Sequence, residues 1–239
     1  NSELLKVTDV SGSEFNMSGG TIVFQKPNLS GGSSIDFDVC GTSGLVNVTG
    51  GELQFGNAST ASGASFNFKP YASETLPGMV VSGPSGTGSS LCPSNASNNT
   101  DTMRLMYLQI NAGCTFDHRS NSGAVGDNKP LVLTDSKLGY AFYNAGTYNP
   151  RTGQTVFSST GDQLISGSSA QTFYGLTMST SGVVTLNKML TITNSLVLIN
   201  GILSSSSTYY PILSAGATTT VGSAASYVSG PMMYQMASV

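Results

Sequence analysis

Hydrophobic and polar residues alternate with a period of two along much of the chain. The pattern is clearest in "VNVTGGELQF" (46–55), "LTMSTSGVVTL" (176–186) and "LTITNSLVLINGIL" (190–203). Strict alternation over a few residues, punctuated by Gly, Asn and Ser, is typical of short β-strands that end at tight turns. A convincing apolar stripe at i, i+3, i+4 and i+7 is not found, so the sequence predicts an all-β fold with almost no helix.

One stretch of ten residues recurs in nearly the same form. "FNMSGGTIVF" (15–24) is followed thirty-one residues later by "VNVTGGELQF" (46–55), and "LTM" (176–178) returns as "LVL" (196–198) after twenty residues. Repeats with periods of 20 to 50 residues are typical of solenoids. Because each repeat contains strands and turns but no helix, we predict a right-handed parallel β-helix with irregular surface loops.

Stacked repeats share one core, so equivalent residues should form columns that point inward. Phe15 should lie above Val46, and Phe24 above Phe55. Further core positions are expected at Met17, Ile22, Val48, Leu53, Leu176, Met178, Leu196 and Leu198, with Thr177 and Val197 pointing the other way.

The chain of 239 residues is interpreted as one segment of a longer β-helix. Residues 1–70 have long repeats of about 31 residues, residues 71–153 are rich in loops, and residues 154–239 have short, regular repeats. Near the end, Met232, Met233, Tyr234 and Met236 would form an exposed apolar edge. We expect this edge to be covered by more of the same chain or by a partner protein.

The composition of the chain excludes some classes of function. Charged residues make up 9% of the chain, the net charge is −3, and no basic run is present. Nucleic acid binding requires clustered Lys and Arg, so we do not expect this chain to bind nucleic acid. No stretch approaches the roughly 20 apolar residues of a membrane span, and the start has no signal peptide. The abundant Gly and hydroxyl residues favour a repetitive extracellular protein.

Residues 161–203 resemble a region common in very large surface proteins of Bacteroidota that are exported by the type IX secretion system. The resemblance extends, more weakly in residues 71–153, over most of 13–232. The matching positions are Gly161, Gln163, Ile165, Ser166, Gly167, Thr172, Phe173, Tyr174, Leu176, Met178, Val184, Leu186, Leu190, Ile192, Leu196, Leu198, Gly201 and Leu203.

The resemblance implies a secreted segment at the outer surface of the cell, acting as a stalk or filament, as in adhesins of gliding or attachment. Its partners would be the secretion machinery during export, further segments of the same chain, and surface glycans or a substratum. The parent chain would carry a signal peptide before this segment and a sorting domain after it.

A carbohydrate-active β-helix enzyme, a polysaccharide lyase or hydrolase, is the alternative from a different class. Such sites need clustered acids facing one groove. Asp36 and Asp38 share a strand face, but no second acidic pair follows at the repeat period, so they are interpreted as solvated carboxylates. His118, beside Asp117 and Arg119, lies in a polar loop. We predict no catalytic residues and no enzyme activity.

No cofactor is expected, and calcium is the one metal considered. Asp101, Asp117, Asp127 and Asp162 could ligate it, but none lies in a calcium-binding loop motif.

Two covalent modifications are candidates. The three cysteines, Cys40, Cys92 and Cys114, fit no zinc spacing, and a Cys92–Cys114 disulfide would join neighbouring repeats. Asp101-Thr102-Met103 resembles the D-[ST]-[AILVMT] motif of Bacteroidota, which makes Thr102 a candidate for O-glycosylation.

Overall fold

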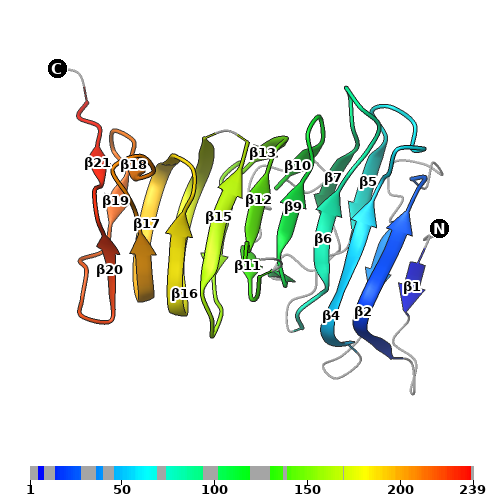
Figure 1. Cartoon of the computed structure of the whole chain (residues 1–239), viewed down its shortest axis with the longest axis horizontal. Helices are drawn as coiled ribbons and strands as arrows, with labels where there is room; N and C mark the ends of the chain where they lie inside the picture. The colour runs from blue at the N-terminus through cyan, green and yellow to red at the C-terminus, as the bar shows by residue number, and fades with distance from the viewer. Residues whose placement is uncertain are drawn as a thin grey trace.

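The structure, a computed structural model, is built from strands alone in the part of the chain that it describes (Figure 1). It describes residues 5–7, 14–27, 36–39, 46–68, 74–93, 102–118, 130–136, 139–168 and 170–237. Every strand pair is parallel. The predicted all-β fold is therefore confirmed.

The strands belong to two sheets. The smaller sheet has six strands in the order β1 (Leu5–Val7), β3 (Phe37–Val39), β5 (Ser65–Phe68), β7 (Ser90–Pro93), β10 (Thr115–Asp117) and β13 (Thr147–Asn149). The larger has fifteen: β2 (Phe15–Phe24), β4 (Val46–Phe55), β6 (Gly78–Val81), β9 (Leu108–Ile110), β12 (Phe142–Asn144), β15 (Gln163–Gly167), β16 (Gln171–Leu186), β14 (Gln154–Phe157), β11 (Leu131–Leu133), β8 (Met103–Leu105), β17 (Leu190–Ser204), β18 (Pro211–Leu213), β19 (Thr218–Thr219), β20 (Ser226–Ser229) and β21 (Met233–Tyr234).

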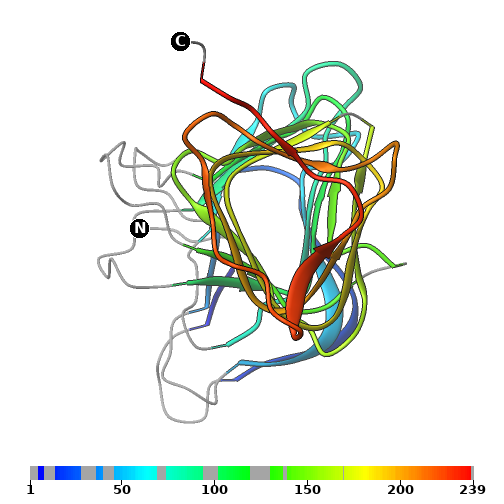
Figure 2. The ribbon, with the colours of Figure 1, turned by 90° about the vertical axis from the view of Figure 1, so that its left-hand side faces the viewer.

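The predicted right-handed parallel β-helix is corrected by this division. In place of a uniform solenoid, the larger sheet curls as a half-barrel, and the small second sheet accompanies it only from β1 to β13. Viewed along the stack, the strands curve around a common interior (Figure 2). The repeat of the sequence is thus present in the structure, but successive repeats contribute different sets of strands.

The reason for the curl lies in the two longest strands, β16 and β17. One part of β16, Gly175–Met178, pairs with β14, and another part, Val184–Leu186, pairs with β15. The short strands β14 and β15 of one repeat are thus continued by a single long, bent strand, β16, in the next. This strand joins the part of the sheet that contains β14 to the part that contains β15. Register shifts along the β16–β17 ladder supply the bends.

Equivalent residues of successive repeats lie side by side, as the repeat predicts. Phe15 pairs with Val46 and Phe24 with Phe55, and all four side chains are buried. The rings of Phe24 and Phe55 are stacked with centroids 4.7 Å apart. This separation matches the spacing of neighbouring strands, so the aromatic column follows directly from strand pairing.

The later repeat is equally well predicted. Leu176 pairs with Leu196 and Met178 with Leu198. Leu176, Met178 and Leu196 are fully buried, and Leu198 is half-buried against the core. Thr177, expected to point the other way from Leu176 and Met178, is not solvated. It is 9% exposed because it lies on a central strand, flanked by Val156 of β14 and Val197 of β17.

One hydrophobic core runs through the whole stack, from Phe15 to Ala217. Met17 and Leu53 are buried in it, and Ile22 and Val48 pack against it half-buried. The first and last strands lie at opposite ends of the stack (Figure 1).

The last strands form an open edge. Among the described strands, β20 pairs with β17 alone and β21 with β18 alone. Met232, Met233, Tyr234 and Met236 are between 43% and 84% exposed, as expected from the sequence. What covers this edge is not shown, so its coverage stays a prediction.

Truncating one buried leucine should destabilise the fold measurably. We expect Leu196→Ala to lower the free energy of unfolding by about 2 to 5 kcal/mol, because it opens a cavity in the core. Ile199→Ala, on the same strand but 60% exposed, should change it by less than about 0.5 kcal/mol. Urea unfolding followed by circular dichroism measures both, and equal effects would contradict the assigned strand faces.

The open edge should cause self-association of the 239-residue chain. Unpaired strand edges and exposed apolar side chains both favour contact with a second copy. Replacing Met233 and Met236 with Lys should shift the mass measured by light scattering toward a monomer. Ile199→Lys, away from the edge, should leave the mass unchanged. A wild-type monomer at all concentrations would contradict this expectation.

Candidate functional site

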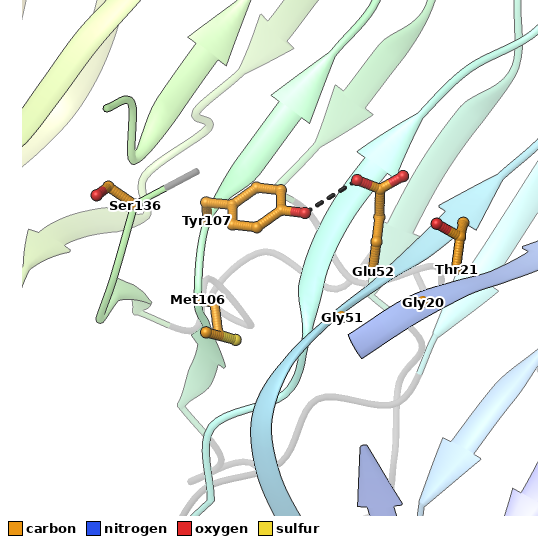
Figure 3. Close-up of a pocket in the computed structure, with 7 residues that line it drawn as sticks. All are labelled: Gly20, Thr21, Gly51, Glu52, Met106, Tyr107 and Ser136. Atoms are coloured by element: carbon orange, nitrogen blue, oxygen red, sulfur yellow. Dashed lines mark hydrogen bonds between the residues drawn. The ribbon is translucent and has the colours of Figure 1, made fainter. Parts of the chain in front are cut away.

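A shallow groove of about 330 Å³ lies on the outer face of the larger sheet (Figure 3). It is bounded by a turn in each of β2 and β4 and by the segment that precedes β9. The described residues that line it are Gly20, Thr21, Gly51, Glu52, Met106, Tyr107 and Ser136. The groove is a candidate binding site, and its size lies near the lower limit for ligand pockets.

Tyr107 and Glu52 meet across an intervening strand. The Tyr107 hydroxyl donates a hydrogen bond to Oε2 of Glu52 at 2.9 Å, although fifty-five residues separate them in the sequence (Figure 3). Between them lies Gly78 of β6. A Cβ atom built on Gly78 would overlap the Tyr107 ring, so the ring can cross β6 only because residue 78 has no side chain.

The Tyr107 hydroxyl is held in its neutral form. Burial of the side chain raises the pKa of Tyr107 far above its usual value near 10, and the hydrogen bond to the Glu52 carboxylate raises this pKa further. A neutral hydroxyl can donate a hydrogen bond to the carboxylate at every physiological pH. The pair is therefore a fixed polar wall of the groove.

Two further tyrosines continue from this pair along the sheet. The rings of Tyr107 and Tyr140 are 6.3 Å apart in an edge-on arrangement, and those of Tyr140 and Tyr143 are 5.2 Å apart. The Tyr140 hydroxyl donates to Oε1 of Gln109 at 2.5 Å. Tyr140 and Tyr143 are half-buried, whereas Tyr107 is only 5% exposed. We call Tyr107, Tyr140 and Tyr143 the tyrosine row.

The glycines of the repeated turn place no side chains on one side of the groove. In the pairing of β2 with β4 the register shifts between Ser18 and Thr21, which marks a bulge at Gly19-Gly20. Gly20 and Gly51 both have positive φ angles, 78° and 97°, which residues with a Cβ rarely adopt. The repeated Gly-Gly pair therefore serves the turn geometry and leaves backbone, rather than side chains, facing the groove.

The described lining of the groove contains one carboxyl group. Hydrolysis of a glycosidic bond generally needs two carboxyl groups on either side of the bond. Among the described lining residues, Glu52 is the one carboxylate. A tyrosine nucleophile would need a lowered pKa, whereas the pKa of Tyr107 is raised.

The structure corrects the interpretation of Asp36 and Asp38 as solvated carboxylates. Asp36 is 1% exposed and Asp38 is fully buried. Oδ2 of Asp36 accepts a hydrogen bond from the backbone N–H of Asn67 at 2.6 Å, which ties β3 to β5. Buried carboxylates bonded in this way have a structural role, since removal of such a group leaves donors without a partner.

His118 is not in a solvated loop, as the sequence suggested, but fully buried at the end of β10. Its Nδ1 lies 2.9 Å from the Tyr148 hydroxyl, which in turn lies 3.0 Å from Oγ1 of Thr155. A Cβ on Gly153 would lie 2.5 Å from the His118 ring. These contacts describe a packed core histidine with hydrogen-bond partners. Arg119 lies outside the described residues.

Of the acidic residues considered for calcium, Asp117 and Asp162 lie in the described part of the chain, and each has another partner there. Asp117 forms a two-point ion pair with Arg151, at 2.9 Å from Nε and 2.6 Å from Nη2. Oδ1 of Asp162 accepts from the backbone N–H of Val183 at 2.8 Å. Asp101 and Asp127 lie outside the described residues. Within the described ranges, no group of three His, Cys, Asp or Glu could hold a metal.

The candidate disulfide is not formed in the structure, and the candidate glycosylation site remains a prediction. Cys92 and Cys114 are free thiols in the structure, and Cys40 lies outside the described residues. Phe116 pairs with Leu91, which sets Cys114 and Cys92 three positions apart along neighbouring strands, roughly 10 Å. A disulfide usually needs Cα atoms within about 7 Å. Thr102 is half-buried at the start of β8.

Comparison with protein-family models, curated proteins and solved structures gives no significant match to any of them. The described residues contain no helix with the length and apolar character needed to cross a bilayer. The site has to be interpreted from its own chemistry.

The sequence interpretation missed Glu52 and the tyrosine row. A usable signal was present: Gln109 and Tyr143 alternate with the buried residues of β9 and β12, and Tyr107 continues the same alternation just before β9. A large aromatic residue at a position that should face solvent is unusual enough to mark a binding face. The sequence does not show which tyrosines become neighbours.

Filling the gap at Gly78 should break the Tyr107–Glu52 pair. We expect Gly78→Ala to displace the Tyr107 ring and to lower the pKa of Tyr107 toward 10, because the hydroxyl loses burial and its carboxylate partner. Ultraviolet titration of tyrosine ionisation measures this change. Gly161→Ala, where the nearest atom lies 4.0 Å from the new Cβ, is the matched control. An unchanged titration in Gly78→Ala would contradict the crossing geometry.

Alkaline pH should destabilise the protein through its buried tyrosines. Burial also raises the pKa of Tyr148, with the Tyr148–Thr155 hydrogen bond opposing this effect. Above about pH 10 the unfolded chain loses phenolic protons that the folded chain retains, so the free energy of unfolding falls as pH rises. We expect a smaller fall in Tyr148→Phe, measured by urea unfolding at pH 9 and pH 11. Equal falls would contradict the assignment.

Proposed function

We propose that this chain is a structural and adhesive segment of a secreted cell-surface protein, which works as a spacer rather than as a catalyst. The observation that carries the proposal is the arrangement of one uninterrupted core along a stack whose first and last strands lie at opposite ends. A chain that enters at one end and leaves at the other separates whatever is joined to its two ends.

The dimensions fit this role. The path β2–β4–β6–β9–β12–β15–β16–β17–β20 contains nine strands. At about 4.8 Å for each of eight steps, it spans roughly 40 Å. The aromatic column of Phe24 and Phe55 and the leucines of β16 and β17 hold neighbouring strands together along this span. The backbone hydrogen bonds between neighbouring parallel strands and the shared core oppose bending of the stack.

Export by the type IX secretion system of a Bacteroidota cell is part of the proposal and is supported by the sequence resemblance of residues 161–203. The composition of the chain is compatible with an extracellular location, since the chain has few charges and abundant Gly and hydroxyl residues. The gene around this segment tests the proposal: a type IX sorting domain encoded downstream supports it, and a cytoplasmic enzyme domain there would contradict it.

A pulling experiment tests the spacer role. Single chains held at both ends should unfold at high force. Leu196→Ala should lower that force, because it loosens the core between β16 and β17, whereas Ile199→Ala should not. Unfolding at the low force typical of a loosely packed domain would contradict a load-bearing role.

An assay for turnover tests the absence of catalysis. Incubation with neutral and acidic polysaccharides, with and without calcium, should release no reducing ends and no unsaturated products. Turnover by the wild type that is lost in Glu52→Gln would overturn the proposal in favour of a carbohydrate-active enzyme. Glu52→Gln is the cleaner variant, because Asp36, Asp38 and His118 are buried and their replacement would disturb the fold.

A further inference from the structure

We infer that the groove and the tyrosine row bind a neutral oligosaccharide, which would make this face of the segment the adhesive one. The inference deepens the proposed function and rests on it for its biological meaning. It depends on three features of the described residues: aromatic rings in a row, a fixed carboxylate, and a lining with little charge.

The tyrosine row suits the apolar side of sugar rings. Tyr140 and Tyr143 are half-buried with ring centroids 5.2 Å apart, and the Tyr107 ring, which is only 5% exposed, extends the series 6.3 Å from Tyr140. Tyrosine combines a flat apolar surface with a polar tip, so it can pack against C–H groups and still donate hydrogen bonds at its rim. A linear ligand can therefore contact more than one ring at a time.

The polar groups suit sugar hydroxyls. The Glu52 carboxylate is oriented by the Tyr107 hydroxyl at 2.9 Å, and a carboxylate can accept several hydrogen bonds at once. Thr21 and Ser136 add hydroxyl groups to the lining, and Met106 adds an apolar wall (Figure 3). Further along the row, the Gln109 side chain bonds both Tyr140 and Asn111, at 2.5 and 2.7 Å, which fixes a line of amides beside the rings.

The charge of the lining favours a neutral ligand over an acidic one. Of the described residues that line the groove, Glu52 is the one with a charged side chain. An anionic sugar such as a uronate would be repelled by this carboxylate. The shallow, open shape suits the side of a polymer chain that passes over the groove, because such a site does not require a chain end.

Gly78 is the residue on which this site depends. Because the Tyr107 ring crosses β6 at Gly78, Glu52 of β4 becomes part of the same surface as Tyr140 and Tyr143 of the next repeats. Without this crossing, the carboxylate and the rings would be separated by the width of one strand.

Isothermal titration calorimetry with hexasaccharides tests the inference. The probes are β-1,4-glucan, α-1,4-glucan, β-1,4-mannan and α-1,4-galacturonan. We expect at least one neutral probe to bind more tightly than the galacturonan. Tyr143→Ala and Glu52→Gln should each weaken that binding about five- to tenfold. Tyr227→Ala, which removes a 40% exposed tyrosine of β20 outside the groove, should leave it unchanged. Circular dichroism and thermal melting verify that each variant is folded.

Four results would overturn the inference. The first is that no neutral probe binds at about 10 mM, a concentration at which even a millimolar Kd would be detected. The second is tighter binding of the galacturonan, and the third is equal affinity in all variants. The fourth is binding of an unstructured peptide with the same dependence on Tyr143 and Glu52. The pulling experiment separates this failure from that of the proposed function. Tyr143 and Glu52 lie outside the core, so their variants should retain the wild-type unfolding force whether or not a saccharide binds.

Discussion

Parallel pairing of equivalent residues is the constraint on which the rest of this structure depends. A strand in the larger sheet can bury its inward side chains only if the next repeat places similar side chains beside them. Phe24 against Phe55 shows this directly, since their stacked rings are 4.7 Å apart, the same distance that separates hydrogen-bonded strands. The repeat in the sequence follows from this geometric requirement, and it needs no acid, base or metal at fixed positions.

The same constraint explains where the buried polar groups lie. Side chains that cannot follow the apolar column need partners in the neighbouring strand or turn. Asn144 donates to Oε1 of Gln171 at 2.8 Å, and Nε2 of Gln163 donates to the carbonyl of Leu133 at 3.1 Å. His118 and Tyr148 satisfy each other inside the core. A residue such as His118, which could be catalytic by its type, is thus fixed inside the stack by hydrogen bonds, as expected for buried polar groups.

The outer face is free of this constraint, and the candidate site lies there. Outward positions need only be compatible with their strand neighbours, so they can vary from repeat to repeat. Glu52 of β4, Gly78 of β6 and Tyr107, just before β9, occupy neighbouring outward positions. The absence of a side chain at one position allows the ring from the next to reach the carboxylate beyond it. A uniform core can therefore support a local binding surface.

The sequence by itself determined the strands, the repeat and most of the core columns, because alternation with a period of two and recurrence of apolar residues depend on local order along the chain. It also identified Leu176, Met178 and Leu196 as buried. Only the tertiary structure decided how many strands each repeat contributes, since the merging of two short strands into β16 depends on bends that the alternation does not encode. Tertiary structure also decided that Asp36, Asp38 and His118 are buried and that Tyr107 meets Glu52. Burial and cross-strand contact depend on what covers a residue, and the covering residues come from repeats that are distant in the sequence.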